Sequence, residues 1–146
     1  MECDATCLIN VFLAFFALVL YGIGSYCLYI KGKGAVLILG IAIFIDVVTA
    51  VLASFKITPT VQIPGMVAVP WNSALFCLHV VFSMIGFLGF IILFIYLLVR
   101  KNAAYKNWIR KWQFYALLPV WVIGELIALS NALLKIVKGV RLFELV

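Results

Sequence analysis

Two carboxylic acids stand out because they lie inside otherwise apolar stretches. Asp46 is the one ionisable residue of "IAIFIDVVTAVLA" (residues 41–53), and Glu125 is the one ionisable residue of "VWVIGELIALS" (residues 120–130). A charged carboxylate facing hydrocarbon costs about 2.5 to 3.5 kcal/mol or more at mid-helix, so both acids should point toward other protein groups. There they could act as interhelical hydrogen-bonding groups, as a proton or cation relay, as the seat of a polar substrate, or as a contact for a partner subunit.

Two further polar side chains could share that site. Thr49 lies one helical turn after Asp46, and His79 has Ser83 one turn beyond it. We therefore predict a buried polar group, with a proton relay as its candidate chemistry, formed by Asp46, Thr49, His79 and Glu125. A lone histidine cannot supply the paired axial ligands of a membrane b-type cytochrome. A metal site with the two acids would need a helix stagger that spacing does not set, and we expect no cofactor and no metal.

The composition of the chain indicates the solvent around these groups. Hydrophobic residues make up 68% of the 146 residues and charged residues 11%, whereas soluble domains have about 45–50% apolar and about 25% charged residues. The mean hydropathy is +1.28. These values are typical of an integral membrane protein. At roughly 20 residues for each span the chain holds four spans with short connections, and we expect one integral membrane domain over residues 1–146.

Four apolar runs are long enough to cross a bilayer, and they cover residues 8–30, 35–55, 73–99 and 112–137. Strands of a β-barrel would instead alternate in hydrophobicity over about 10 residues. We predict an all-α membrane protein whose four transmembrane helices form an up-down-up-down bundle of two hairpins. Asp46 lies 13 residues after Lys33, and Glu125 lies 14 residues after Lys111. At about 1.5 Å per residue, the two acids should share a depth of roughly 20 Å from the basic side.

Basic residues are concentrated in two of the three connections. The first connection has Lys31 and Lys33, and the third has five Lys and Arg residues between positions 100 and 111, whereas the second has Lys56 alone and the N-terminus is acidic. The positive-inside rule therefore places the first and third connections in the cytoplasm, and both termini outside the cell membrane. Three basic residues in the C-terminal tail argue the other way, but tail charges usually count for less than the loops flanking earlier spans.

The second connection is unusually apolar for a solvated loop. Residues 56–70, "KITPTVQIPGMVAVP", contain three prolines and should run extended. This segment either folds over the outer mouth of the bundle or docks onto a partner. On the third predicted helix, small residues recur at a spacing that lets another helix approach closely. We predict a partner interface, either with other integral membrane subunits or with a second copy of the chain and not with nucleic acid, formed by Ile63, Met66, Ser83, Gly86 and Gly89.

Sequence motifs of enzymes are absent. The four cysteines form no CxxC pair, and the chain has no GxSxG, HExxH or Walker loop. We therefore expect no enzymatic activity. Cys3, Cys7 and Cys77 fall on the predicted outer side, where a disulfide between two of them would be compatible with an oxidising exterior.

The second half of the chain resembles a known family. "LHVVFSMIGFLGFIILFIYLLVRKNAAYKNWIRKWQF" followed by "PVWVIGE" is similar to the pattern of small four-helix membrane proteins of domain-of-unknown-function family 420. The matching features are His79 at the start of a helix, the basic turn at residues 100–111, and Pro119, Trp121 and Gly124. The histidines that the family tends to carry after its basic turns are replaced here by Lys or Asn. The resemblance implies a four-helix fold and a role in the maturation of haem-copper terminal oxidases.

Two classes of function remain after these exclusions. Small size, buried acids that can be neutral, an apolar outer loop and no catalytic constellation favour a non-catalytic integral subunit or assembly factor of a larger membrane complex, with a respiratory or redox complex as the favoured one. The alternative is a small proton-coupled transporter or ion-conducting oligomer that uses Asp46 and Glu125.

Overall fold

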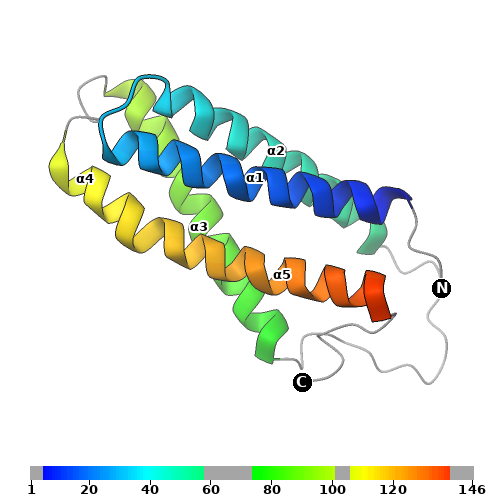
Figure 1. Cartoon of the computed structure of the whole chain (residues 1–146). Helices are drawn as coiled ribbons and strands as arrows, with labels where there is room; N and C mark the ends of the chain where they lie inside the picture. Colours follow the sequence, from blue (N-terminus) through cyan, green and yellow to red (C-terminus); the bar gives the residue numbers. More distant parts are fainter. Residues whose placement is uncertain (1–4, 58–73, 101–105, 139–146) are drawn as a thin grey trace.

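The structure is a computed structural model that describes residues 5–57, 74–100 and 106–138. Nearly all of these residues lie in helices (Figure 1). The elements, in chain order, are α1 (Ala5–Tyr29), α2 (Ala35–Ile57), α3 (Ala74–Val99), α4 (Asn107–Trp112), η3 (Gln113–Leu117) and α5 (Leu118–Lys138). The last three are one continuous helix, since η3 is a π-helical turn between α4 and α5.

Four stretches within these helices are long and apolar enough to span a membrane: Leu8–Tyr29, Ala35–Leu52, Ala74–Val99 and Asn107–Leu134. The prediction of an all-α fold with four helices of membrane-spanning length is therefore confirmed, and the chain has the architecture of a multi-pass membrane protein. The up-down alternation and the sides on which the termini lie stay predictions.

The fourth helix begins earlier than the sequence indicated. We predicted a start at Trp112, with residues 100–111 as a connection, but the helix begins at Asn107. The basic residues in this turn lower its hydropathy, yet Ile109 is buried and the Arg110 guanidinium is used within the fold. Its Nε donates to the carbonyl oxygen of Tyr29 over 2.8 Å, and its Nη2 donates to the same oxygen. Arg110 thus caps the C-terminal end of α1, where carbonyl groups lack helical partners.

The π-helical turn has an identifiable cause in the spacing of buried residues. Along this helix Ile109, Gln113, Leu117 and Trp121 are all buried, at intervals of four residues. In a regular α-helix such a series drifts by about 40° at each step, because one turn takes 3.6 residues. The wider turn from Gln113 to Leu117, closed by the bond from the Leu118 amide to the Gln113 carbonyl, offsets part of the drift. It also lies directly before Pro119, whose ring disfavours a regular turn upstream.

The turn between α1 and α2 is tight and uses two left-handed residues. Lys31 has φ of 61° and Gly34 has φ of 83°. The amide of Gly32 donates to the Cys27 carbonyl over 2.6 Å, which closes the end of α1 as helix C-terminal motifs commonly do. A connection this short brings the two helices directly against each other.

Helix packing places a single cluster of buried residues in the middle of the bundle. The most extensive contacts join α1 with α2 and α3 with α5, the pairs expected to form hairpins, and α1 also packs on α5. In Figure 1, α3 crosses behind α1 and α5, whereas α1, α2 and α5 run in similar directions. The largest fully buried apolar side chains, Trp121, Tyr21, Phe90, Leu28 and Leu39, come from all four long helices.

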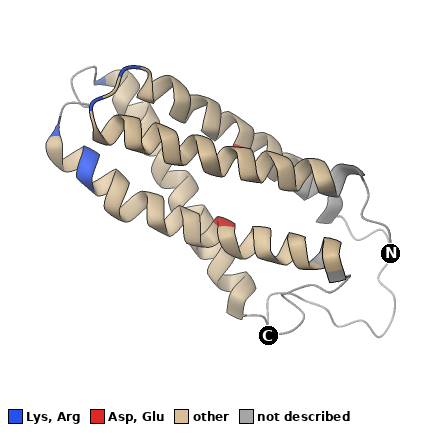
Figure 2. Cartoon of the chain, viewed as in Figure 1, with Lys and Arg blue, Asp and Glu red and all other residues tan. Residues whose placement is uncertain are grey.

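Lys56, Lys135 and Lys138 belong to the C-terminal ends of α2 and α5. The Lys and Arg residues drawn in blue in Figure 2 lie together at the other end of the bundle. They belong to the α1–α2 turn, the residue after α3, and α4 with the residue before it. The described acidic residues lie near the middle of their helices instead. The charge asymmetry used to orient the chain is therefore also an asymmetry of the fold.

Candidate functional site

Asp46 is held by side chains from two other helices. Its Oδ2 atom accepts a hydrogen bond from the Tyr21 hydroxyl of α1 over 3.4 Å and another from the Trp121 indole Nε1 of α5 over 3.3 Å. The carboxyl group of α2 is thus a shared acceptor for α1 and α5. Both donors are fully buried, so without Asp46 their polar hydrogens would lie in an apolar interior.

The two donors are fixed by an aromatic cluster formed by Tyr21, Phe90 and Trp121. The ring centroids of Tyr21 and Trp121 are 4.1 Å apart, and those of Tyr21 and Phe90 are 4.5 Å apart. Phe90 of α3 also meets Trp121 edge to face at 6.4 Å. Because each ring is buried against the other two, the hydroxyl and indole groups are held in place for Asp46.

Glu125 belongs to a second set of hydrogen bonds, between α3 and α5. The Ser83 hydroxyl donates to Glu125 Oε1 over 3.0 Å. His79 Nδ1 lies 2.9 Å from the Gly124 carbonyl oxygen and 3.1 Å from Ser83 Oγ. A carbonyl can only accept, so Nδ1 carries a hydrogen, and the Ser83 oxygen accepts a share of it while giving its own hydrogen to Glu125. A hydrogen-bonded chain therefore runs from His79 through Ser83 to Glu125.

The two sets lie next to each other. Trp121 and Glu125 are one helical turn apart on α5, so both project from the same face of that helix. Asp46 and Glu125 therefore lie near each other, since Trp121 donates to Asp46 and Glu125 follows Trp121 by one turn. This proximity agrees with the shared depth expected from their spacing to Lys33 and Lys111. Chemically, the arrangement can join helices through hydrogen bonds, and it contains groups that can exchange protons.

Close approach of α3 and α5 depends on three glycines. A Cβ atom on Gly86 would lie 2.3 Å from Trp121 Cβ, and one on Gly124 would lie 2.5 Å from Ser83 Oγ. A Cβ on Gly89 would lie 2.3 Å from Leu117 Cδ1. The small residues let the backbones come near enough for Ser83 and His79 to reach α5.

One prediction about these residues is wrong. We expected Ser83, Gly86 and Gly89 to receive a helix of a partner, but the glycines contact Trp121 and Leu117 of the chain itself. The stripe is used inside the bundle because α3 and α5 pack against each other, so it is not available for a partner's helix. The other two residues of that predicted interface, Ile63 and Met66, lie outside the described residues.

Thr49 takes a different place from the one predicted. Its hydroxyl donates to the Ile45 carbonyl oxygen of its own helix over 2.9 Å, a back-bond typical of threonine in helices. The donors to the two acids are instead Tyr21, Trp121 and Ser83. Sequence reasoning had assigned none of them to the acids, and it had placed Ser83 in the partner interface. A signal for the first two existed, since a tyrosine and a tryptophan far from the ends of a span need a hydrogen-bond partner there.

Within the part of the chain that the structure describes, no three His, Cys, Asp or Glu side chains come together in a group that could hold a metal ion. The disulfide prediction stays a prediction, because Cys3 and the side chain of Cys7 lie outside the described part. Cys27 is a half-buried free thiol.

Comparisons with known proteins do not place the chain in a family. No family model matches the chain, and neither a curated protein nor a solved structure matches it. The resemblance of the second half to the four-helix family 420 stays a hypothesis based on the residues quoted for it.

Proposed function

We propose that this chain is a non-catalytic integral subunit or assembly factor of a larger membrane complex. The observation that supports this proposal best is the use of Asp46 as a shared hydrogen-bond acceptor for α1 and α5. A half-buried acid whose carboxyl group joins three helices has a structural explanation that needs no substrate. The Ser83–Glu125 bond between α3 and α5 has the same explanation.

A respiratory or redox complex is the partner we propose, since the resemblance of the second half of the chain implies oxidase maturation. Extraction in a mild detergent and purification through a C-terminal tag test this. We expect the chain to leave the membrane with other integral subunits in fixed ratio, and haem absorbance to accompany them. The proposal is contradicted if the chain is recovered without other proteins, as a monodisperse species, both from untreated cells and from membranes that were cross-linked before extraction.

Amide variants separate a structural role of the acids from a chemical one. Asp46→Asn and Glu125→Gln keep an oxygen that accepts the hydrogen bonds of Tyr21, Trp121 and Ser83. We expect both variants to accumulate, fold and co-purify with partners as the parent does. A variant that is stable and assembled, but in which the complex is inactive, would assign the acid a role in chemistry.

A second candidate function has its own supporting observation. The hydrogen-bonded chain from His79 through Ser83 to Glu125, next to Asp46, is the kind of arrangement along which protons move in transporters. A small proton-coupled transporter or ion-conducting oligomer would use it.

Proton flux in liposomes tests the second candidate. Ser83→Ala interrupts the chain of hydrogen bonds, whereas Ser130→Ala removes an exposed hydroxyl on the same helix as Glu125. A transporter should show flux that Ser83→Ala and Glu125→Gln abolish and Ser130→Ala leaves unchanged. Vesicles of the purified chain that are no leakier than empty ones would remove this candidate.

We also propose that the basic end of the bundle is cytoplasmic and that both termini lie outside the cell membrane. The Lys and Arg residues drawn in blue in Figure 2 gather at that end, as the positive-inside rule expects of a cytoplasmic side. In a chain whose four native cysteines are changed to Ser, an impermeant thiol reagent should label Ala74→Cys in intact cells but Lys33→Cys only after lysis. The opposite pattern would invert the orientation.

A further inference from the structure

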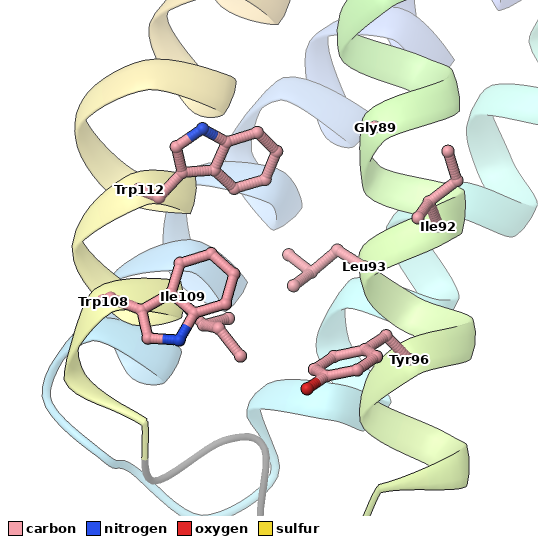
Figure 3. A pocket seen from close by; sticks show the side chains of 7 residues that line it. All are labelled: Gly89, Ile92, Leu93, Tyr96, Trp108, Ile109 and Trp112. Atoms are coloured by element: carbon pink, nitrogen blue, oxygen red, sulfur yellow. The ribbon is translucent and has the colours of Figure 1, made fainter.

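A cavity of about 450 Å³ lies between α3 and α4 near the basic end of the bundle (Figure 3). Its walls are formed by Gly89, Ile92, Leu93 and Tyr96 of α3 and by Trp108, Ile109 and Trp112 of α4. In Figure 3 the α4 side chains face those of α3 across the space, and the Tyr96 hydroxyl points toward α4. This size is within the range of about 300–1,000 Å³ that small-molecule sites occupy.

The cavity has the chemistry of a site for a hydrocarbon chain. Most of its lining is aliphatic or aromatic, and two of its wall residues, Leu93 and Ile109, belong to the buried core. Its rim faces outward, since Ile92 is 68% exposed and Trp108 64% exposed. In a bilayer such an opening meets lipid, because the outer surface of the spans lies in hydrocarbon.

Two of the three polar groups in the cavity walls, the Tyr96 hydroxyl and the Trp108 indole nitrogen, are found toward the basic end of the bundle, whereas the Trp112 indole nitrogen lies at the level of Gly89 (Figure 3). The Trp108 indole and the Tyr96 hydroxyl are amphipathic groups of the kind that lie at the level of lipid head groups. Gly89, in contrast, lies two turns deeper along α3 than Tyr96. An occupant with one polar end would therefore place that end near Tyr96 and its apolar part toward Gly89.

Three cationic residues lie close in sequence to the residues that line the cavity at its basic end. Arg100 follows Tyr96 by one helical turn and is exposed, and its amide donates to the Tyr96 carbonyl over 2.9 Å. Lys106, just before α4, and Lys111, between Trp108 and Trp112, are exposed as well. Arg110 differs from them, since its guanidinium is bonded to the Tyr29 carbonyl. Three exposed cations next in sequence to the walls of an apolar cavity complement one occupant: a molecule with hydrocarbon chains and an anionic head.

We propose that this cavity, the α3–α4 groove, binds an anionic phospholipid of the surrounding leaflet. One acyl chain lies between Ile92 and Trp112, and the phosphate lies near Arg100 and Lys106. Basic pockets between transmembrane helices on the cytoplasmic side recognise anionic head groups in this way. The charge requirement separates this occupant from a neutral isoprenoid or a helix of a partner, neither of which would need the cations.

Native mass spectrometry of the purified full chain tests the proposal directly. The probes are phosphatidylglycerol and phosphatidylcholine with identical acyl chains, titrated onto delipidated protein. We expect phosphatidylglycerol to bind more tightly, and the double variant Arg100→Gln, Lys106→Gln to lose that preference by about fivefold for each cation removed. The matched control is Lys31→Gln, Lys33→Gln, which removes two exposed cations of the α1–α2 turn at the same end of the bundle.

A second pair of variants tests the hydrocarbon part of the site. Ile92→Trp adds bulk at the groove, whereas Ile95→Trp adds the same bulk at an exposed position of α3 that does not line it. Ile92→Trp should reduce binding of both lipids, and Ile95→Trp should reduce neither. The proposal is overturned if Ile92→Trp binds phosphatidylglycerol as the parent does, or if the control without Lys31 and Lys33 loses as much preference as the groove variant. Equal affinity of the parent for the two lipids would overturn it as well.

Discussion

Two polar regions hold this bundle together, and they use different acceptors. In the middle, Asp46 and Glu125 accept hydrogen bonds from side chains of neighbouring helices. At the basic end, Arg110 donates to the Tyr29 carbonyl, and the amide of the fully buried Gln113 donates to the Ser25 carbonyl over 2.8 Å. The middle thus depends on carboxyl groups, whereas the basic end depends on backbone carbonyls of α1.

The two kinds of acceptor differ in whether they can gain or lose a proton. A backbone carbonyl always accepts and never titrates, so the contacts of Arg110 and Gln113 are insensitive to proton concentration. A carboxyl group can gain or lose a hydrogen and then offers a different set of bonds. The basic end is therefore suited to fixing helix positions, whereas the acids in the middle can also exchange protons. Four substitutions test this comparison, from the largest expected effect to the smallest.

Gly86→Leu should have the largest effect, because it separates α3 from α5 at the level of the acids. The added Cβ atom alone would lie 2.3 Å from the Cβ atom of Trp121 and 2.7 Å from the Cα atom of Trp121. Backbone atoms cannot move aside without shifting a helix. We expect a loss of about 3 kcal/mol or more of unfolding free energy, measured by denaturant titration in detergent micelles.

The matched control is Gly22→Leu on α1, where an added Cβ would meet nothing within 4 Å. This variant should unfold like the parent. If both variants are equally stable, the close contact between α3 and α5 is not present in the membrane.

Asp46→Leu should have the next effect. It leaves the Tyr21 hydroxyl and the Trp121 indole without their shared acceptor in a buried position. Interhelical hydrogen bonds in membranes contribute about 0.6 kcal/mol on average and up to about 1.7 kcal/mol, so two of them predict a loss of about 1–3 kcal/mol. Asp46→Asn serves as the control because it keeps an acceptor oxygen. Equal stability of the Leu and Asn variants would contradict a role of Asp46 in joining helices.

Arg110→Met should have a smaller effect, confined to the basic end. It keeps the length of the side chain but removes the donors to the Tyr29 carbonyl, with a loss of about 1 kcal/mol. Hydrogen exchange should accelerate in the last turn of α1, while exchange near Asp46 stays unchanged. Lys111→Met removes an exposed neighbouring charge and should change neither. Faster exchange around Asp46 in the Arg110 variant would mean that the two regions are coupled.

Thr49→Val should have the smallest effect. The Thr49 hydroxyl is bonded to a carbonyl of its own helix, so its removal leaves the contacts between helices intact. We expect a change within about 0.5 kcal/mol in unfolding free energy. A larger loss, comparable to that of Asp46→Leu, would place Thr49 in the polar group after all.

Much of the fold could be predicted from the sequence because lipid imposes a simple requirement. A span must be long, apolar and helical, and this requirement locates all four helices to within a few residues, except at Asn107. That start was missed because Arg110 is charged, and a hydropathy pattern cannot show that its charge caps the end of α1. The π-helical turn was missed as well, since it depends on which residues are buried in the folded bundle.

The site could be predicted in part, for a related reason. Asp46 and Glu125 were found because an acid in an apolar run must face inward, and no structure is needed for that step. Their donors were harder to find, because contacts such as Tyr21 with Asp46 join helices far apart in the sequence. The small residues Ser83, Gly86 and Gly89 were predicted to form a close-packing surface, but for a partner's helix. Residue spacing does not show which helix packs on such a surface, and in the structure it is α5 of the same chain.

The π-helical turn at Gln113–Leu117 has a consequence for how this helix tolerates a change in length. Adding one residue to a regular span rotates everything downstream by about 100°, which would turn an inward acid toward lipid. A turn with i→i+5 bonds accommodates one extra residue within itself. An extra residue taken up at Gln113–Leu117 would therefore leave Trp121 on the buried face and Glu125 pointing inward.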